Sequence, residues 1–165
     1  MKKSDVLVPK GMEMAYEQFH FAPAVRAGGL LRCSGQLGTN ERFAIVSSDP
    51  EAQFVQAFEN VKHVLAAAKL DFSDVVEMTT FHVGLREHLA TFLAVKDRYF
   101  AAPWPAWTAI GVVELAAAGA LVEIRVTARL RAGGEAKAKP RSAAKTRTKK
   151  RPARKPAARK RRGGR

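Results

Sequence analysis

Glu123 is the residue of this chain whose surroundings most readily suggest chemistry, because it is the only acid in the strand-like run GALVEIRVTARL at 119–130. Alternate side chains of a strand lie on opposite faces, so Glu123 and Arg125 share one face. Two interpretations follow. Glu123 forms an ion pair with Arg125 or Arg32, or it lies in a dry cleft where a raised pKa suits it to proton transfer.

Both tryptophans lie in the stretch AAPWPAWTAIGV at 101–112. An indole offers a large apolar face and a single N–H donor, so it suits either a core or a pocket wall. For Trp104 we expect packing or a position at a cleft rim. Trp107 is considered further below.

The cysteine and the histidines are not spaced along the sequence as catalytic partners or metal ligands are. Cys33 has no His or Asp partner at a recognisable distance along the chain and is predicted to be a small buried residue. The four histidines, His20, His63, His82 and His88, lack metal-ligand spacing. Neither Gly28-Gly29 nor Ser34-Gly35 opens a helix carrying the residues of a phosphate loop. We therefore predict no metal, nucleotide or other cofactor.

Charge divides the 165 residues into two parts. Residues 131–165 hold sixteen Lys or Arg and one acid, whereas residues 1–130 hold thirteen bases and fourteen acids. The first part has the length of one domain with its own core. With a single cysteine, no secretory signal and no apolar run of bilayer length, a cytoplasmic protein is expected.

The alternation of apolar patterns predicts an α+β domain. Short strands are predicted at Leu30–Ser34, Val75–Val83, Trp107–Val113 and Ala120–Leu130. A helix begins at Ser48-Asp49-Pro50-Glu51, where Asp can cap and Pro can open the first turn, and its stripe is Phe54, Phe58, Val61, Leu65 and Ala68. A second helix is predicted from Arg86 to Phe100. Both helices should cover one face of the sheet, leaving the other to solvent or a second subunit.

Residues 131–165 contain no Val, Ile, Leu, Phe, Tyr or Trp, which predicts a disordered arm. Its density of positive charge is typical of contact with nucleic acid or another polyanion; the alternatives are an anionic membrane surface and a simple solubilising end. Without aromatic side chains it should bind phosphates with little sequence preference. The residues expected to do so are Lys149, Lys150, Arg151, Arg154, Lys155, Arg159, Lys160, Arg161 and Arg162.

Residues 13 to 130 resemble the Rid family, the reactive intermediate deaminases also described as YjgF-like. The resemblance lies in four segments in the same order: LLRCSGQLG, FENVKHVLAAAKLDFSDVVEMTTFHV, DRYFAAPWPAWTAIGVVEL and GALVEIRVTARL. It implies that residues 1–130 form a chorismate-mutase-like domain. It further implies a homotrimer with small-molecule clefts between the subunits.

Family members that hydrolyse imines and enamines use a Glu to position water, a cleft glycine and an Arg that holds the substrate carboxylate. Glu123 and Gly35 match the first two, whereas Trp107 stands where the Arg is expected. Leu93 and Phe21 replace a polar Asn and a Tyr, and Thr108 and Ala109 follow Trp107. All these replacements are toward apolar side chains, so the predicted cleft has little affinity for a carboxylate.

The resemblance therefore implies a protein that binds a small imine- or enamine-like metabolite and leaves open whether it hydrolyses it. The alternative is a non-catalytic metabolite-binding or scaffold protein that the basic arm tethers to nucleic acid. Ribonuclease activity, proposed for some family members, ranks last because no pair of His and Lys residues explains it.

Overall fold

A computed structural model describes residues 1–131 of the chain. The predicted disordered arm and its phosphate-binding residues lie outside this range. Arg131 was placed in that arm, but its guanidinium group bonds to the carboxylates of Asp71 (3.0 Å) and Asp74. The last described residue is thus held to the domain by two ion pairs.

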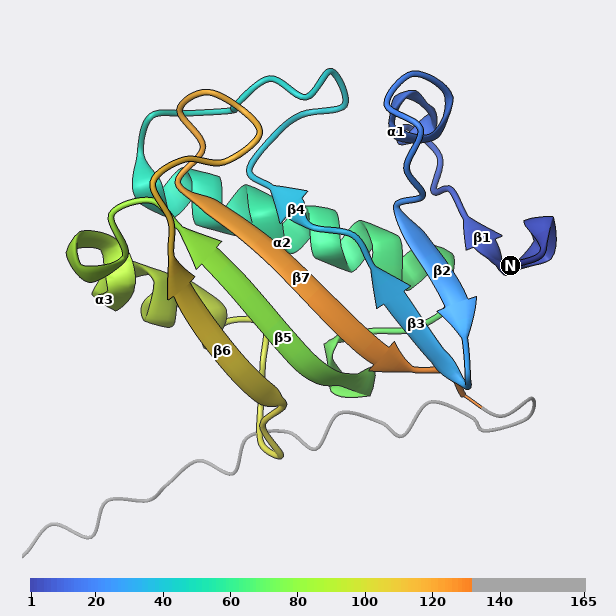
Figure 1. The fold of residues 1–165 in the computed structure, drawn as a ribbon. Helices are drawn as coiled ribbons and strands as arrows, with labels where there is room; N and C mark the ends of the chain where they lie inside the picture. Colours follow the sequence, from blue (N-terminus) through green and yellow to red (C-terminus); the bar gives the residue numbers. More distant parts are fainter. Residues whose placement is uncertain (132–165) are drawn as a thin grey trace, which may run out of the picture. The chain divides into compact units, whose positions relative to one another are not determined.

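The described chain forms an α+β fold (Figure 1). Its strands are β1 (Val6–Leu7), β2 (Ala24–Ala27), β3 (Leu30–Cys33), β4 (Gln36–Leu37), β5 (Val75–His82), β6 (Ala106–Gly111) and β7 (Val122–Arg129). Its helices are α1 (Glu13–Glu17), α2 (Pro50–Ala67) and α3 (Leu85–Lys96), with short 3-10 turns at Lys3–Asp5 and Phe72–Asp74.

The strands make one mixed sheet in the order β1-β2-β3-β7-β5-β6. β5 and β6 run parallel and the other neighbours antiparallel, while β4 pairs with β7 separately from β3. Helices α2 and α3 lie on the same side of this sheet (Figure 1). This arrangement confirms the predicted α+β class with two helices on one face; the opposite face is called the outer face below.

The alternation along β7 places its apolar side chains in the core. Val122, Ile124, Val126 and Ala128 are all buried beneath the helices, whereas Arg125 and Arg129 are exposed on the outer face. The core is rich in aromatic contacts, with the ring of Phe58 stacked on those of Phe92 and Tyr99. These ring contacts join α2 to α3 and to the segment that follows α3.

Helix α2 begins as its sequence predicts. The Asp49 side chain accepts a hydrogen bond from the Ala52 N–H, and Pro50 occupies the first turn. A buried glutamine was not foreseen: the Gln53 amide donates to the carbonyls of Ser47 and Gly119 and accepts from the Leu121 N–H. These bonds tie the helix to the loop that leads into β7.

Several predicted boundaries were wrong. Helix α3 ends at Lys96 rather than Phe100. The N–H groups of Arg98 and Tyr99 bond to carbonyls three residues earlier, which is the tighter pattern of a 3-10 turn. Phe100 is nevertheless buried. Strand β6 ends at Gly111, and Val113 is almost fully exposed. The elements β1, β2, β4 and α1 were not predicted. Across residues 1–131, no helix is both long and apolar enough to cross a membrane.

Candidate functional site

Glu123 lies on the outer face of β7, with Leu37 of β4 beside it on one side and Phe81 of β5 on the other. Its carboxylate lies directly against the backbone of Gly35, where a Cβ atom would overlap the Glu123 side chain. Any larger residue at position 35 would therefore displace the carboxylate. This close approach explains the glycine that the sequence analysis placed in the cleft.

The Gly35 segment is held by the chain that leads to β2. The Ser34 hydroxyl donates to the Ala22 carbonyl at 2.7 Å, and the Ser34 N–H donates to the Pro23 carbonyl at 2.9 Å. The Gln36 side chain donates to the Ser34 carbonyl at 3.1 Å. These bonds hold the segment between β3 and β4 against residues 22–23. Phe21, which precedes them, therefore lies in the same region as Gly35.

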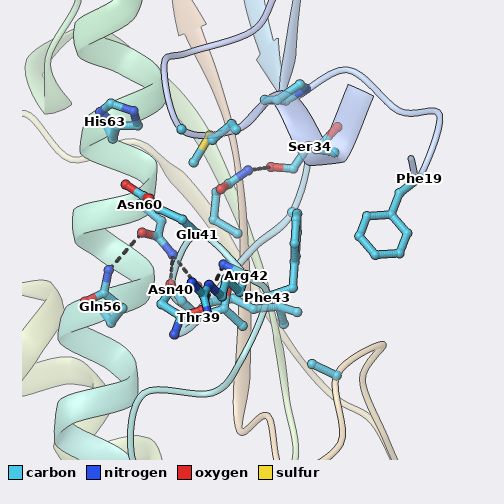
Figure 2. Close-up of a pocket in the computed structure, with 18 of the residues that line it drawn as sticks. Phe19, Ser34, Thr39, Asn40, Glu41, Arg42, Phe43, Gln56, Asn60 and His63 are labelled. Carbon is cyan, nitrogen blue, oxygen red and sulfur yellow. Dashed lines mark hydrogen bonds between the residues drawn. The ribbon is translucent and has the colours of Figure 1, made fainter. Parts of the chain in front are cut away.

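Phe21, Gly35 and Glu123 line one cavity of about 1050 Å³. Figure 2 shows Gln56, Asn60 and His63 of α2 on one side of it and Phe19 on the opposite side. The Asn60 amide donates to the carbonyls of Leu37 and Thr39, which fixes the chain after β4 as part of the wall. Three of the predicted site residues are thus brought together.

The environment of Glu123 favours its protonated form. Partial burial raises the pKa of the Glu123 carboxyl, and the positive charge of Arg125 only partly opposes this effect. Within residues 1–131 the carboxylate accepts no side-chain hydrogen bond and forms no ion pair, so the alternative of a pair with Arg125 or Arg32 is not realised. An acid of this kind can exchange protons with a ligand in the cavity.

Trp107 lies away from this cavity. It pairs in register with Met78 of β5 and packs toward α3, with its ring centroid 5.8 Å from that of Phe92. Its indole N–H donates to the Thr80 hydroxyl at 3.0 Å. Within one chain the Trp107 and Glu123 side chains lie on opposite faces of the sheet, so the structure of a single chain does not bring them together.

The remaining predicted site residues accompany Trp107 at the β6–α3 edge. Thr108 and Ala109 follow it on β6, and Leu93 is half-buried on α3. Lys96 of α3 places its ammonium group 5.4 Å from the Trp104 ring centroid and 5.5 Å from that of Trp107, and it pairs with Asp97. The cation beside Trp107 is thus Lys96 of α3, whereas the family pattern places an Arg on the strand.

Cys33 and the histidines differ in burial and in their partners. Cys33 is buried as predicted, and desolvation raises its pKa to about 12, which leaves an unreactive thiol. His82 is buried, with Nε2 2.8 Å from the Thr80 hydroxyl and Nδ1 without a partner among the described residues. His63 is exposed against the Lys10 carbonyl. In residues 1–131 no three His, Cys, Asp or Glu side chains are grouped so that they could hold a metal ion.

Sequence reasoning missed part of the cavity wall, namely Phe19 and Phe43. Phe19 is 56% exposed, and its ring meets that of Phe43 edge to face at 5.1 Å. Both belong to connecting segments, where apolar periodicity carries no signal. An aromatic residue within a polar connecting stretch is the only hint that the sequence offers.

Comparisons with known proteins identify the family of the chain. Residues 13–130 match the family model described as Endoribonuclease L-PSP. The chain is 36% identical over 135 residues to the RutC family protein YjgH of Escherichia coli strain K12, covering 79% of this chain and 98% of that protein.

It is also 36% identical over 98 residues to a 2-iminobutanoate/2-iminopropanoate deaminase of Dermatophagoides farinae, covering 58% and 74% of the two chains. The solved structure of protein YjgH superposes with a TM-score of 0.69 at 36% identity, over 76% of this chain and 95% of the other. The chain therefore belongs to the Rid/YjgF/L-PSP family.

Proposed function

We propose that this protein hydrolyses a small imine or enamine, releasing ammonia, and that Glu123 carries the proton transfer. The supporting observation is the Glu123 carboxylate, half-buried beside the Gly35 backbone in a large cavity and without an ion-pair partner in residues 1–131. A family relative is named as an imine deaminase. Imine carbons are already electrophilic, so the protein needs only to orient the substrate and move protons.

A single carboxylate can carry out every proton transfer of this hydrolysis. Ionised Glu123 accepts a proton from water as the water oxygen forms a bond to the imine carbon, and the carboxyl group returns this proton to the nitrogen, giving a neutral carbinolamine. Glu123 then accepts the hydroxyl proton and passes it to the nitrogen as the carbonyl forms and the carbon–nitrogen bond breaks; an enamine first takes up a proton at carbon to become the imine. Ammonia leaves and a carbonyl product remains. The raised pKa of Glu123 brings the carboxylate closer to the basicity that both steps require.

The proposal includes a chorismate-mutase-like homotrimer with the cavities at subunit boundaries. In that assembly Trp107, Leu93, Thr108 and Ala109 of one chain approach the Glu123 cavity of its neighbour. Indole cannot form the paired charge-assisted bonds that an Arg makes to a carboxylate. The preferred substrate is therefore one without the carboxylate of an imino acid.

The test compares ammonia release from 2-iminobutanoate and from its uncharged amide, each generated in situ. We expect kcat/KM to be higher for the amide, and Glu123→Gln to lower it by about 10²- to 10⁴-fold, the usual worth of general acid–base catalysis. Glu77→Gln, which removes an exposed acid of β5, is the matched control and should be neutral. Turnover of 2-iminobutanoate equal to that of an Arg-bearing relative and abolished by Glu123→Ala would contradict the altered substrate preference.

A second candidate, a metabolite-binding scaffold tethered to nucleic acid, is favoured by the sixteen basic residues of 131–165. Chains ending after Arg131 keep the ion pairs to Asp71 and Asp74 and so isolate the effect of the arm. The full chain should bind duplex DNA with an affinity that falls steeply with salt, and the shortened chain should not. Equal affinity of the two would refute the tether, whereas intact function in Glu123→Gln would favour the scaffold over the enzyme.

A further inference from the structure

Three phenylalanines form one wall of the Glu123 cavity, and we call Phe19, Phe21 and Phe43 the aromatic wall. Phe19 and Phe21 are 56% and 39% exposed, although the core a few residues away buries phenylalanine completely. Phe19 and Phe43 meet edge to face with an interplanar angle of 75°. Exposed rings gathered around a cavity are typical of a ligand-binding surface.

The backbone conformation at this wall is costly. His20, between Phe19 and Phe21, has φ 56°, and Phe43 itself has φ 59°. Left-handed backbone costs a residue with a side chain about 1–2 kcal/mol. Among the described residues the only other non-glycine case is Lys69, which follows the end of α2, where such a conformation is routine. Strain at both segments of the wall points to a functional constraint on the rings.

The loop that carries Phe43 is held in place by Asn40. The Asn40 side-chain oxygen accepts from the N–H groups of Arg42 at 2.9 Å and Ala44 at 3.1 Å. The Asn40 N–H donates to the Ala44 carbonyl, and the Phe43 N–H donates to the Asn40 carbonyl. Phe43 is therefore presented by a closed turn, which places its ring before any ligand arrives.

In a single chain the cavity is larger than a three- or four-carbon substrate needs. Its volume of about 1050 Å³ is slightly above the ~300–1000 Å³ of pockets that bind drug-sized ligands. Its cationic lining residues, Lys10 and Arg42, are exposed, whereas Glu123 lines the same cavity as Phe21 and is half-buried. The cavity thus combines three phenylalanine rings with cationic side chains that are exposed to solvent.

We propose that the substrate carries an aromatic ring, which rests on the aromatic wall while the carbon–nitrogen double bond lies at Glu123. This inference rests on the proposed function for the reacting group, and it adds the chemical class of the substituent. Ring-on-ring contacts contribute beyond the area that they bury, so each phenylalanine of the wall should affect affinity separately.

The test uses two ketones as unreactive stand-ins for the carbonyl product: benzylacetone, which carries a phenyl ring, and butanone, which does not. Dissociation constants are measured by NMR titration of the full chain. We expect benzylacetone to bind at least tenfold more tightly, and Phe19→Ala and Phe43→Ala each to weaken it by about threefold to tenfold. The affinity for butanone should change less than twofold.

Matched variants separate ring binding from loss of fold. Tyr16→Ala removes an exposed aromatic of α1 that does not line the cavity and should leave both affinities unchanged. Phe19→Leu keeps apolar bulk without a ring and should weaken benzylacetone in the same direction as Phe19→Ala. Equal affinity for the two ketones, or benzylacetone binding that is insensitive to Phe19 and Phe43, would overturn the inference.

Failure of the proposed function would look different. Glu123→Gln should retain the preference for benzylacetone while it lowers the rate of ammonia release by about 10²- to 10⁴-fold. If benzylacetone binds through the aromatic wall and no imine is hydrolysed, the proposed ring-binding site is supported and the proposed hydrolase activity is refuted. If imines with and without an aromatic ring are hydrolysed at equal rates, the proposed hydrolase activity is supported and the proposed ring-binding site is refuted.

Discussion

The side chain of Glu123 gives up hydration without gaining an ion-pair partner in residues 1–131, and this has a cost for stability. A carboxyl group with a raised pKa in the folded state holds its proton to higher pH than it does in the unfolded chain. Folding stability therefore falls as the pH rises from the unfolded value of 4.5 through the folded pKa, and it stays reduced above that. The same arrangement that suits proton transfer thus opposes folding.

Glu123→Gln should accordingly be more stable than the wild type at pH 7.5 and lose this advantage at pH 4, where the wild-type carboxyl is largely protonated. The measurement is the free energy of unfolding in urea at both pH values. Glu77→Gln, on the exposed part of the same face, serves as the comparison and should show no such crossover. A Glu123→Gln variant that is less stable at pH 7.5 would mean that the carboxylate has a favourable partner in solution.

Phe43 offers a separate test of backbone strain. Phe43→Ala and Phe43→Gly both remove the ring and its contact with Phe19, but only glycine adopts a φ of 59° without steric cost. We expect Phe43→Gly to be more stable than Phe43→Ala by about 1 kcal/mol, measured by thermal or urea unfolding. Equal stabilities would show that the loop relaxes when the ring is absent.

At the level of the elements, β5 carries a buried titratable group. Burial, assisted by the nearby charge of His88, lowers the pKa of His82 from 6.5 to about 4. The ring packs against Phe92 at 4.7 Å and shares the Thr80 hydroxyl with Trp107. The neutral imidazole is thus part of the packing between β5, β6 and α3, and protonation would place a charge inside it.

The sign of the resulting pH dependence follows from the two pKa values. The unfolded chain takes up a proton at His82 below pH 6.5 and the folded chain only near pH 4, so stability is fully present above 6.5 and declines as the pH falls between them. The total effect is on the order of 3 kcal/mol. His82→Phe should flatten the unfolding free energy between pH 7 and pH 4.5, whereas His63→Gln, at an exposed site, should not.

The elements also show what their own sequences can and cannot specify. The alternation in β7 and the Asp49-Pro50 start of α2 act locally, so the sequence predicts both. Strands β1 and β4 have two residues each, too few for any periodicity, and they exist only because β2 and β7 provide partners. At the site, Gly35 and Glu123 follow from motif positions. The left-handed backbone at Phe43 cannot be predicted from the sequence, because an aromatic residue normally avoids that conformation.

At the scale of the whole molecule, neither long helix of residues 1–131 covers the outer face of the sheet. Both long helices pack on the opposite face (Figure 1). Ile110 of β6 is 39% exposed. Ile110 pairs with Phe81, which in turn pairs with Glu123. An apolar strip thus runs across the outer face to the reactive acid, as expected if subunits of the predicted homotrimer meet there.

Ile110→Glu should therefore dissociate the assembly, because a carboxylate buried at a subunit interface without a partner costs several kcal/mol. Ala66→Glu adds the same charge at an exposed position of α2 and should leave the trimer intact. The mass of each variant in solution is measured by analytical ultracentrifugation, with ammonia release assayed on the same samples. A monomeric wild type, or a trimeric Ile110→Glu variant, would exclude the outer face as the interface. Loss of turnover together with dissociation would show that the cavity of one chain needs the Trp107 edge of another.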